Sequence, residues 1–222
     1  MGIQSDPALF GSGFARHLND CYWTEPAVSK ALARRIPKGV KAVWEPACGR
    51  GDMAQVLLAH GKSVFCSDLD ISNIDVKAAA KVGVPVRRGN FLDDKDIPEF
   101  VTMEDIDAIC TNPPFGDDAE RFVRQALTFS NIRFFAFVLR SEWKHGKSRL
   151  DLFTKEPYSS EIVLTWRPRW DWWMTEDEKR AARIANGKDP DKDYSPRHNF
   201  SILCWDREHK GPPTQQFAVR GD

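Results

Sequence analysis

Apolar residues in this chain gather into short runs, and amphipathic stretches separate the runs. Apolar runs bounded by turn residues predict buried strands, which we expect at residues 41–45, 63–68, 84–88, 105–110, 134–139, 161–165 and 200–205. Between them, apolar positions recur at helical spacing, as in Met53, Val56 and Leu57 and again in Phe122 and Val123. This alternation of strands and helices predicts an α/β fold.

A glycine turn follows the first expected strand. Residues 46–52 read Pro-Ala-Cys-Gly-Arg-Gly-Asp, where Gly49 and Gly51 permit positive φ and let a ligand approach the backbone closely. Glu45, at the strand end, can serve a cationic ligand. Ala54 stands where a dinucleotide-binding turn needs its third glycine, and no P-loop lysine follows. We therefore expect a ligand without phosphates, although a tight turn in any doubly wound protein would look the same.

Two later strand ends carry further candidates for contact with this ligand. Asp68 ends strand 63–68, at about the distance beyond a glycine turn where such folds place a ribose-binding carboxylate. Asp70 is its rival. Asn90 and Phe91 follow strand 84–88, and for them a turn asparagine and a core phenylalanine are the structural alternatives.

Asn112-Pro113-Pro114-Phe115 directly follows strand 105–110. An Asn side-chain carbonyl and one backbone carbonyl can accept both N–H groups of a planar amine, such as the exocyclic nitrogen of adenine or cytosine, and so free its lone pair. The prolines stiffen the turn, and Phe115 offers a face to a flipped base. Ligands bind at the carboxyl ends of strands in open α/β sheets, so the motif predicts an amine-activating site. A proline turn after a strand is the alternative.

In these motifs the chain resembles the amino-methylating S-adenosylmethionine-dependent methyltransferases. Their signature after the fourth strand, an Asp, Asn or Ser followed by two prolines and an aromatic residue, matches residues 112–115. Residues 45–51 look like their motif I, and residues 22–26 resemble their motif X. The resemblance spans roughly residues 22–205, and the closing run through residues 211–213 looks like the small adenine methyltransferases of phages and prophages.

The resemblance implies a Rossmann-like class I methyltransferase with a seven-stranded, mostly parallel sheet whose last strand is antiparallel. It implies S-adenosylmethionine as cofactor and direct transfer of a methyl group to an amine held by Asn112 and the Pro113 carbonyl. The expected cofactor contacts are Trp23, Thr24, Glu45, Ala47, Gly49, Gly51, Asp68, Asn90 and Phe91. A helix-capping Thr24 and a packed Trp23 would fit the sequence equally well.

Two segments are candidates for binding the methyl acceptor. Residues 140–149 leave the fifth strand at the same sheet edge as Asn112, and basic residues beside an aromatic one suit a nucleic acid; a solvated helix start is the alternative. The connection 166–197 is too long to be only a link, although tryptophans this close together more often pack against the domain. The candidate contacts are Arg140, Trp143, Lys144, Lys147, Arg149, Arg167 and Arg169.

Composition fits a single domain over residues 21–222, with residues 1–20 as a loosely attached lead-in and residues 166–197 as an insertion. The five cysteines lack metal-ligand spacing, which predicts no metal site and suits a reducing cytosol. Since no apolar run reaches the length of a membrane span, we expect no membrane contact and a cytoplasmic location in a bacterial or phage-infected cell. The 32 basic and 32 acidic side chains give a formal net charge of zero, which argues against a large DNA-binding footprint.

The sequence thus predicts a methyltransferase that acts on an exocyclic amine, with N6 of adenine in DNA as the first choice. An RNA base or a protein glutamine, whose amide is a similar planar amine, is the alternative acceptor. An alternative of another class is a catalytically silent nucleic-acid-binding module with the same fold. The intact motif at residues 112–115 argues against that module.

Overall fold

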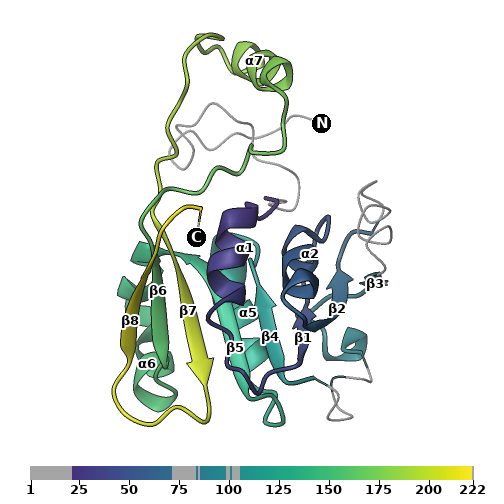
Figure 1. Cartoon of the computed structure of the whole chain (residues 1–222), viewed down its shortest axis with the longest axis vertical. Coiled ribbons are helices and arrows are strands. Elements are labelled where there is room, and N and C mark those ends of the chain that lie inside the picture. The colour runs from purple at the N-terminus through teal and green to yellow at the C-terminus, as the bar shows by residue number, and fades with distance from the viewer. Residues whose placement is uncertain (1–21, 72–83, 85, 99–100, 102–105, 222) are drawn as a thin grey trace.

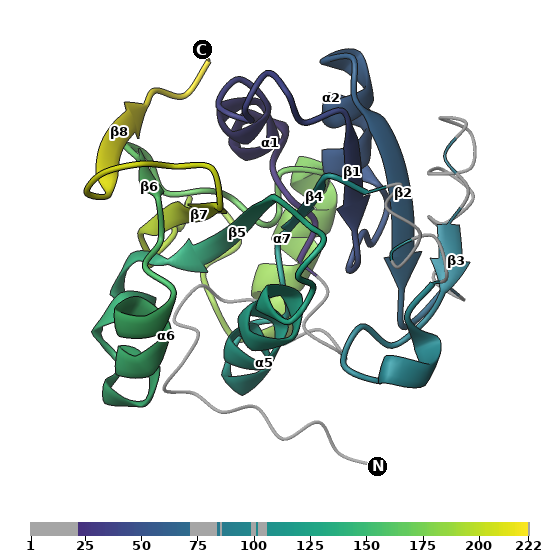
Figure 2. The ribbon, with the colours of Figure 1, turned by 90° about the horizontal axis from the view of Figure 1, so that it is seen from below.

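The computed structural model describes residues 22–71, 84, 86–98, 101 and 106–221, so the expected lead-in at residues 1–20 lies outside it. In this part of the chain a sheet of eight strands carries helices on both faces (Figure 1; Figure 2). The strands are β1 Ala42–Glu45, β2 Ser63–Asp68, β3 Val86–Arg88, β4 Ala108–Thr111, β5 Phe134–Arg140, β6 Ser160–Leu164, β7 Phe200–Asp206 and β8 Thr214–Ala218. The α-helices are α1 Pro26–Ala33, α2 Asp52–Ala59, α5 Asp117–Leu127, α6 Leu150–Lys155 and α7 Glu176–Ala185.

The strand order is β3-β2-β1-β4-β5-β7-β6-β8. The first five strands in this order, from β3 through β1 to β5, are parallel to one another. Strand β7 runs antiparallel to both β5 and β6. The predicted α/β fold with a mostly parallel sheet is therefore confirmed. The chain crosses from one half of the sheet to the other between β1 and β4, which is the switch point where such sheets bind ligands beyond the strand ends.

The predicted number of seven strands is wrong by one, because β8 follows β7. The antiparallel strand is β7, whereas β8, the last strand, pairs in parallel with β6. Strand β8 has no apolar run to reveal it: Thr214 to Phe217 are exposed and only Ala218 is buried. An edge strand covered on neither face needs no apolar run, so hydrophobic patterning misses it.

The core forms two layers because neighbouring side chains of a strand point to opposite faces of the sheet. Phe134 of β5 packs in the cluster that includes Leu32 of α1 and Leu57 of α2. Phe135 packs on the other face, in the cluster that includes Phe122 of α5. Strands buried on both faces read as continuous apolar runs, which is how most of them could be predicted.

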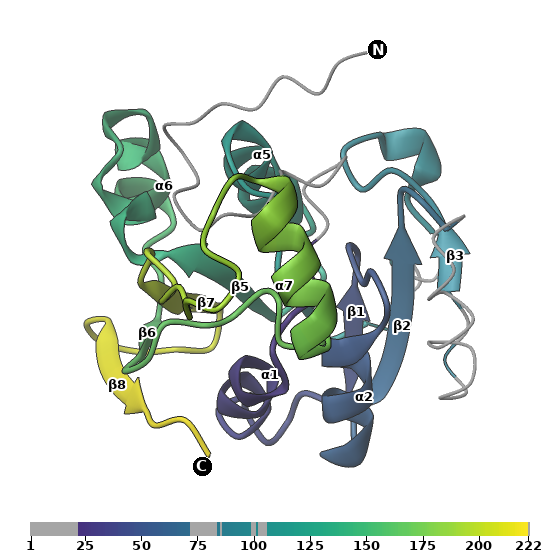
Figure 3. The ribbon, with the colours of Figure 1, turned by 90° about the horizontal axis from the view of Figure 1, so that it is seen from above.

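The insertion carries α7, which lies across the edge of the sheet where the parallel strands end (Figure 3). Thr175 caps this helix: its hydroxyl accepts the Glu178 N–H, and the Glu178 carboxylate accepts the Thr175 N–H. An ion pair of 2.9 Å between Arg180 and Asp191 holds the returning chain to the helix. Among the described helices, none is long and apolar enough to cross a membrane.

Candidate active site

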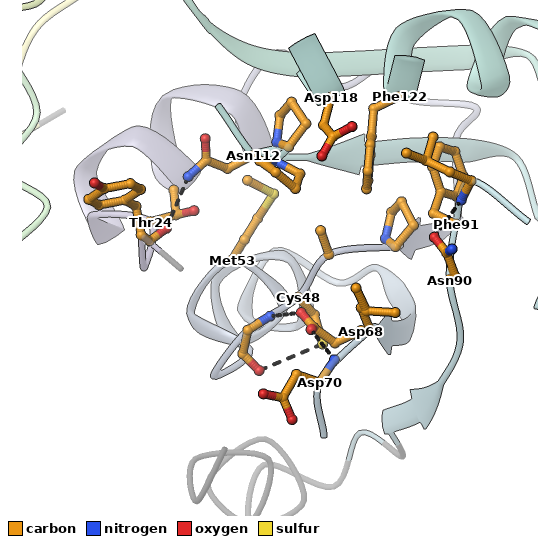
Figure 4. Close-up of a pocket in the computed structure, with 18 of the residues that line it drawn as sticks. Thr24, Cys48, Met53, Asp68, Asp70, Asn90, Phe91, Asn112, Asp118 and Phe122 are labelled. Atoms are coloured by element: carbon orange, nitrogen blue, oxygen red, sulfur yellow. Dashed lines mark hydrogen bonds between the residues drawn. The ribbon is translucent and has the colours of Figure 1, made fainter. Parts of the chain in front are cut away.

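A cavity of about 290 Å³ opens where β1, β2 and β4 end (Figure 4). The expected site residues in its wall are Trp23, Thr24, Ala47, Gly49, Asp68, Asn90, Phe91, Asn112, Pro113 and Pro114. The wall also includes residues that the sequence analysis did not propose as ligand contacts, namely Tyr22, Met53, Leu69, Asp118, Arg121 and Phe122. Segments from four strand ends, those of β1, β2, β3 and β4, thus meet at one place with the segment before α1, as ligand sites of α/β sheets do.

Glu45 and Gly51, two expected cofactor contacts, do not line the cavity. The Glu45 side chain is buried beneath the glycine turn, its Oε2 atom lacks a hydrogen-bond partner among the described residues, and burial raises the pKa of this carboxyl well above its usual value. Gly51, with a φ of 81°, begins α2. Both residues therefore belong to the structure of the turn and not to the cavity wall.

Asp68 projects from the end of β2 into the cavity (Figure 4). Its Oδ2 accepts the Gly49 N–H at 2.8 Å, and its Oδ1 accepts the Asp70 N–H at 3.0 Å. Burial raises the pKa of this carboxyl, although the two backbone donors oppose that effect. A carboxylate oxygen with one donor keeps a lone pair for another, so Asp68 can still accept hydrogen bonds from a ligand. The rival Asp70 lines the cavity as well.

Asn90 and Phe91 have structural roles and also line the cavity. The Asn90 Oδ1 atom accepts the Leu92 N–H at 3.0 Å, which is the turn geometry expected of an asparagine in a loop. Phe91 is buried between Trp44 and Phe122, with ring centroids 5.2 and 4.7 Å away. For each residue, a structural role and contact with a ligand are therefore compatible.

The segment before α1 closes one side of the cavity. Glu25 occupies the N-cap position of α1, so Thr24 is not the cap and instead lies buried in the wall. The Trp23 ring lies against Gly49, where an added Cβ would come within 3.1 Å of the indole Cδ1. Gly49 also has a φ of 49°. Both the positive φ and the close ring explain why glycine stands there.

Asn112 lies at the end of β4 with its amide turned in a defined direction (Figure 4). Its Nδ2 donates to the Tyr22 carbonyl at 3.2 Å. Its Oδ1 is buried and has no hydrogen-bond partner among the described residues. An unpaired buried acceptor costs about 1–3 kcal/mol, and such an atom in a native site calls for an explanation. A ligand with an N–H group would supply the missing donor.

Phe115 belongs to an aromatic cluster beside Asn112. The Tyr22 ring stacks on it, with centroids 4.9 Å apart and an interplanar angle of 22°. Trp170 and Phe200 contact it at centroid distances of 5.6 Å each. A base can stack on this face of Phe115 only after the Tyr22 ring has moved.

A second cavity, of about 240 Å³, begins on the other side of the Asn112–Phe115 turn. Its wall consists of Phe115, Gly116, Asp117, Ala119, Leu139, Arg140, Glu142, Trp143 and Arg149. The Nε atom of Arg140 and the Nε1 atom of Trp143 are buried donors without a partner among the described residues. The Arg140 guanidinium lies 5.7 Å from the centre of the Phe115 ring. Three expected substrate residues thus meet beside Phe115.

Residues 141–149 form two short 3₁₀ turns, Ser141–His145 and Lys147–Arg149. Lys144 is held by Glu161 at 2.6 Å. Arg149 pairs with Glu120 at 3.0 Å and donates to the Trp143 carbonyl at 2.7 Å. Lys147 is exposed and has no ion-pair partner in the described part of the chain. Lys144 and Arg149 therefore fasten this segment to the domain.

Arg167 and Arg169, the candidates in the insertion, line neither cavity. The Arg167 guanidinium donates to Asn199 Oδ1 at 3.1 Å. Arg169 pairs with Asp171 at 3.2 Å and with Asp193 at 2.8 Å. Both side chains hold the insertion together. In the described residues, no group of three or more His, Cys, Asp or Glu side chains is arranged to hold a metal ion.

A scan against protein-family models and a search of curated proteins found no match for the chain. Among solved structures, it is similar to the methyltransferase subunit of a type I restriction-modification system from Streptococcus thermophilus, with a TM-score of 0.59 and 12% identity over 85% of this chain and 45% of that one. The fold is that of the Rossmann-like methyltransferases.

Two further structures have the same fold. One is a putative RNA methyltransferase from Pyrococcus horikoshii, with a TM-score of 0.54, 14% identity and coverage of 82% of this chain and 83% of that one. The other is TrmK of M. capricolum in complex with S-adenosyl-homocysteine, with a TM-score of 0.52, 12% identity and coverage of 86% and 72%. This chain spans less than half of the Streptococcus thermophilus subunit. At these identities the similarity establishes the fold alone.

Proposed function

We propose that this protein transfers a methyl group from S-adenosylmethionine to an exocyclic amine, namely N6 of adenine in DNA. The observation that carries the proposal concerns Asn112, a residue in the wall of the first cavity: its Oδ1 atom is a buried acceptor without a hydrogen-bond partner among the described residues. An amine donates to such an atom, whereas a hydroxyl or carboxylate acceptor of the methyl group has no second N–H for a neighbouring carbonyl.

The first cavity fits the proposed cofactor in charge. Its wall carries the carboxylates of Asp52, Asp68, Asp70 and Asp118 against the single cation Arg121. An acidic wall favours a ligand with sulfonium and ammonium charges and disfavours the phosphates of a dinucleotide. When bound, S-adenosylmethionine supplies an electrophilic methyl group. Asp68 is placed to accept the ribose hydroxyls, so Asp68→Ala should weaken binding of S-adenosyl-homocysteine at least about tenfold.

Asn112 and Pro113 act on the acceptor. The Asn112 Oδ1 atom accepts one N–H of the amine and the Pro113 carbonyl accepts the other, which directs the nitrogen lone pair toward the cofactor side of the turn. The bond from Asn112 Nδ2 to the Tyr22 carbonyl keeps Oδ1 from rotating away. Pro114 fixes the backbone, and Phe115 stacks the base once Tyr22 has moved.

The second cavity is the proposed binding site for the part of the acceptor that adjoins the target base. Arg140 and Trp143 line it, and each has a buried N–H donor without a partner in the part of the chain that the structure describes; exposed Lys147 lies on the adjoining turn. Donors of this kind suit phosphate oxygens and base edges. This arrangement favours a nucleic acid over a glutamine side chain, because glutamine has neither phosphate oxygens nor a base edge. Such an enzyme would work in the cytoplasm of a bacterial or phage-infected cell, where DNA is its substrate.

The test is mass spectrometry of nucleosides after incubation of DNA and, separately, RNA with the protein and isotopically labelled cofactor. We expect labelled N6-methyladenine from DNA, and far less of it with Asn112→Ala. Label found only in RNA would assign RNA as the acceptor. Label in glutamine of a protein, with no nucleoside product, would refute the nucleic-acid assignment, and binding of S-adenosyl-homocysteine without any transfer would favour the silent module.

A further inference from the structure

Three tryptophans within residues Trp170–Trp173 of the insertion contact residues of the first cavity wall; we call these four residues the tryptophan segment. The indole N–H of Trp172 donates to the Trp23 carbonyl at 3.1 Å. The ring of Trp173 meets the ring of Trp23 edge-on, with centroids 4.1 Å apart. Trp173 also donates to the Trp170 carbonyl at 3.2 Å, which closes the segment into a turn. The insertion thus reaches Trp23, a residue of the cavity wall.

The same rings surround Arg50 in the glycine turn. Its guanidinium lies 4.4 Å from the centre of the Trp23 ring, 5.5 Å from that of Trp172 and 5.6 Å from that of Trp173. Asp52, another wall residue, pairs with it at 3.2 Å. The face of an aromatic ring attracts a cation, and the attraction grows when water is excluded. Arg50 therefore couples the glycine turn to the insertion.

A buried carboxylate anchors the start of the tryptophan segment. Glu25 is buried at the N-terminus of α1; its Oε2 accepts the Arg169 N–H at 3.1 Å and its Oε1 pairs with Arg220 at 2.6 Å. Because a buried charge must be paired, the chain just before Trp170 is fixed to the residues that precede α1. The tryptophan segment is thus held at its start by Glu25 and further along by its contacts with Trp23 and Arg50.

We propose that Trp172 and Trp173 are positioning residues for the cofactor: they press Trp23 onto Gly49 and hold Arg50, and so retain the ligand of the first cavity. The role rests on the proposed cofactor and is independent of the acceptor. The proposed role assigns the tryptophan segment to cofactor binding, whereas the side chains of Arg167 and Arg169 only hold the insertion together. Without these rings, Trp23 and the glycine turn lose their fixed positions, and the ligand dissociates faster.

The test is calorimetric binding of S-adenosyl-homocysteine to the full chain and three variants. Trp172→Phe removes the indole N–H and should weaken binding about two- to tenfold, the effect of one lost hydrogen bond. Trp173→Leu removes the ring from Trp23 and Arg50 and should weaken it by at least about fivefold. Trp205→Phe is the matched control, because Trp205 also donates its indole N–H to a carbonyl, that of Glu156 at 2.8 Å, on the opposite face of the sheet.

The control should lose at least as much thermal stability as Trp172→Phe, because Trp205 is the more buried of the two, while it binds S-adenosyl-homocysteine like the wild type. That separation of affinity from stability is the expected result. Wild-type affinity in both Trp172→Phe and Trp173→Leu, or an equal loss of affinity in Trp205→Phe, would overturn the role. A raised KM for DNA at unchanged affinity for S-adenosyl-homocysteine would overturn it in favour of acceptor contact. A wild-type protein that does not bind S-adenosyl-homocysteine would refute the proposed cofactor and this role with it.

Discussion

The side-chain amide of Asn112 donates a hydrogen bond from its nitrogen, whereas its oxygen accepts none from the residues that the structure describes. The Tyr22 carbonyl, ninety residues earlier in the sequence, accepts the amide N–H, and the amide oxygen is buried. The motif at residues 112–115 predicted the position of Asn112 beyond a strand end, since a proline turn is a local property; its chemistry stays a prediction. The partner that fixes the amide could not be predicted, because its carbonyl is a backbone atom of another segment.

Replacement of Asn112 by Ala should reduce methyl transfer by about 10²–10³-fold, the usual effect of removing one acceptor or donor that acts in the transition state. The affinity for S-adenosyl-homocysteine should change less than twofold because the amide acts on the acceptor amine. Single-turnover kinetics and calorimetry measure the two effects. Retention of most of the activity would show that the amine is polarised by another group.

Glu45→Gln should stabilise the protein at alkaline pH. The raised pKa of this buried carboxyl means that the folded chain binds a proton more tightly than the unfolded chain, so stability falls as the pH rises above the ordinary glutamate pKa. A neutral amide removes that loss. We expect a higher Tm for the variant at pH 8, with a smaller gain at pH 5. A lower Tm at pH 8 would mean that the carboxylate is paired in the folded state.

At the scale of elements, the strands and helices that pack on the sheet could be predicted from their apolar patterns. Two regions could not. Strand β8 lacks a buried face, as described above, and residues 141–149 form 3₁₀ turns where the sequence allowed a helix start. The ion pair of Lys144 with Glu161 and that of Arg149 with Glu120 determine the path of that segment, and each joins residues distant in sequence.

Lys144→Ala should destabilise the domain by about 1.5–3 kcal/mol at neutral pH, the value of a hydrogen bond to a charged group. Burial tends to raise the pKa of Glu161, but hydrogen bonds from Lys144, Ser201 and Gln215 lower it below its usual value. Stability from a carboxyl with a lowered pKa is present at neutral pH and disappears as the pH falls through that pKa, so the effect should vanish in acid. Urea unfolding at two pH values measures it. Lys147→Ala, at an exposed position, is the control and should have no effect.

Over the whole molecule, basic and acidic side chains balance. A neutral protein contacts few phosphates, so DNA binding should depend weakly on salt. We expect the slope of log Kd against log salt concentration to correspond to on the order of two to four released counterions. Fluorescence anisotropy with a labelled oligonucleotide measures the slope. A slope several times steeper would reveal a basic surface that the net charge conceals.

Long-range packing is what the sequence leaves open at this scale. The glycine turn, Asp68 and the proline motif could be predicted because each is a short pattern at a strand end. The contact between Trp172 and Trp23 joins residues 149 positions apart, and no local pattern encodes it. The cluster of tryptophans predicted packing against the domain but not the surface on which they pack.

Trp23 and Trp173 lie with ring centroids 4.1 Å apart and planes inclined at 68°. Indoles at this separation couple their electronic transitions, so the pair adds a couplet to the circular dichroism spectrum that isolated tryptophans do not produce. Trp23 also lines the first cavity. A ligand that shifts this ring therefore changes the couplet, and the unlabelled protein carries its own optical reporter of what enters that cavity.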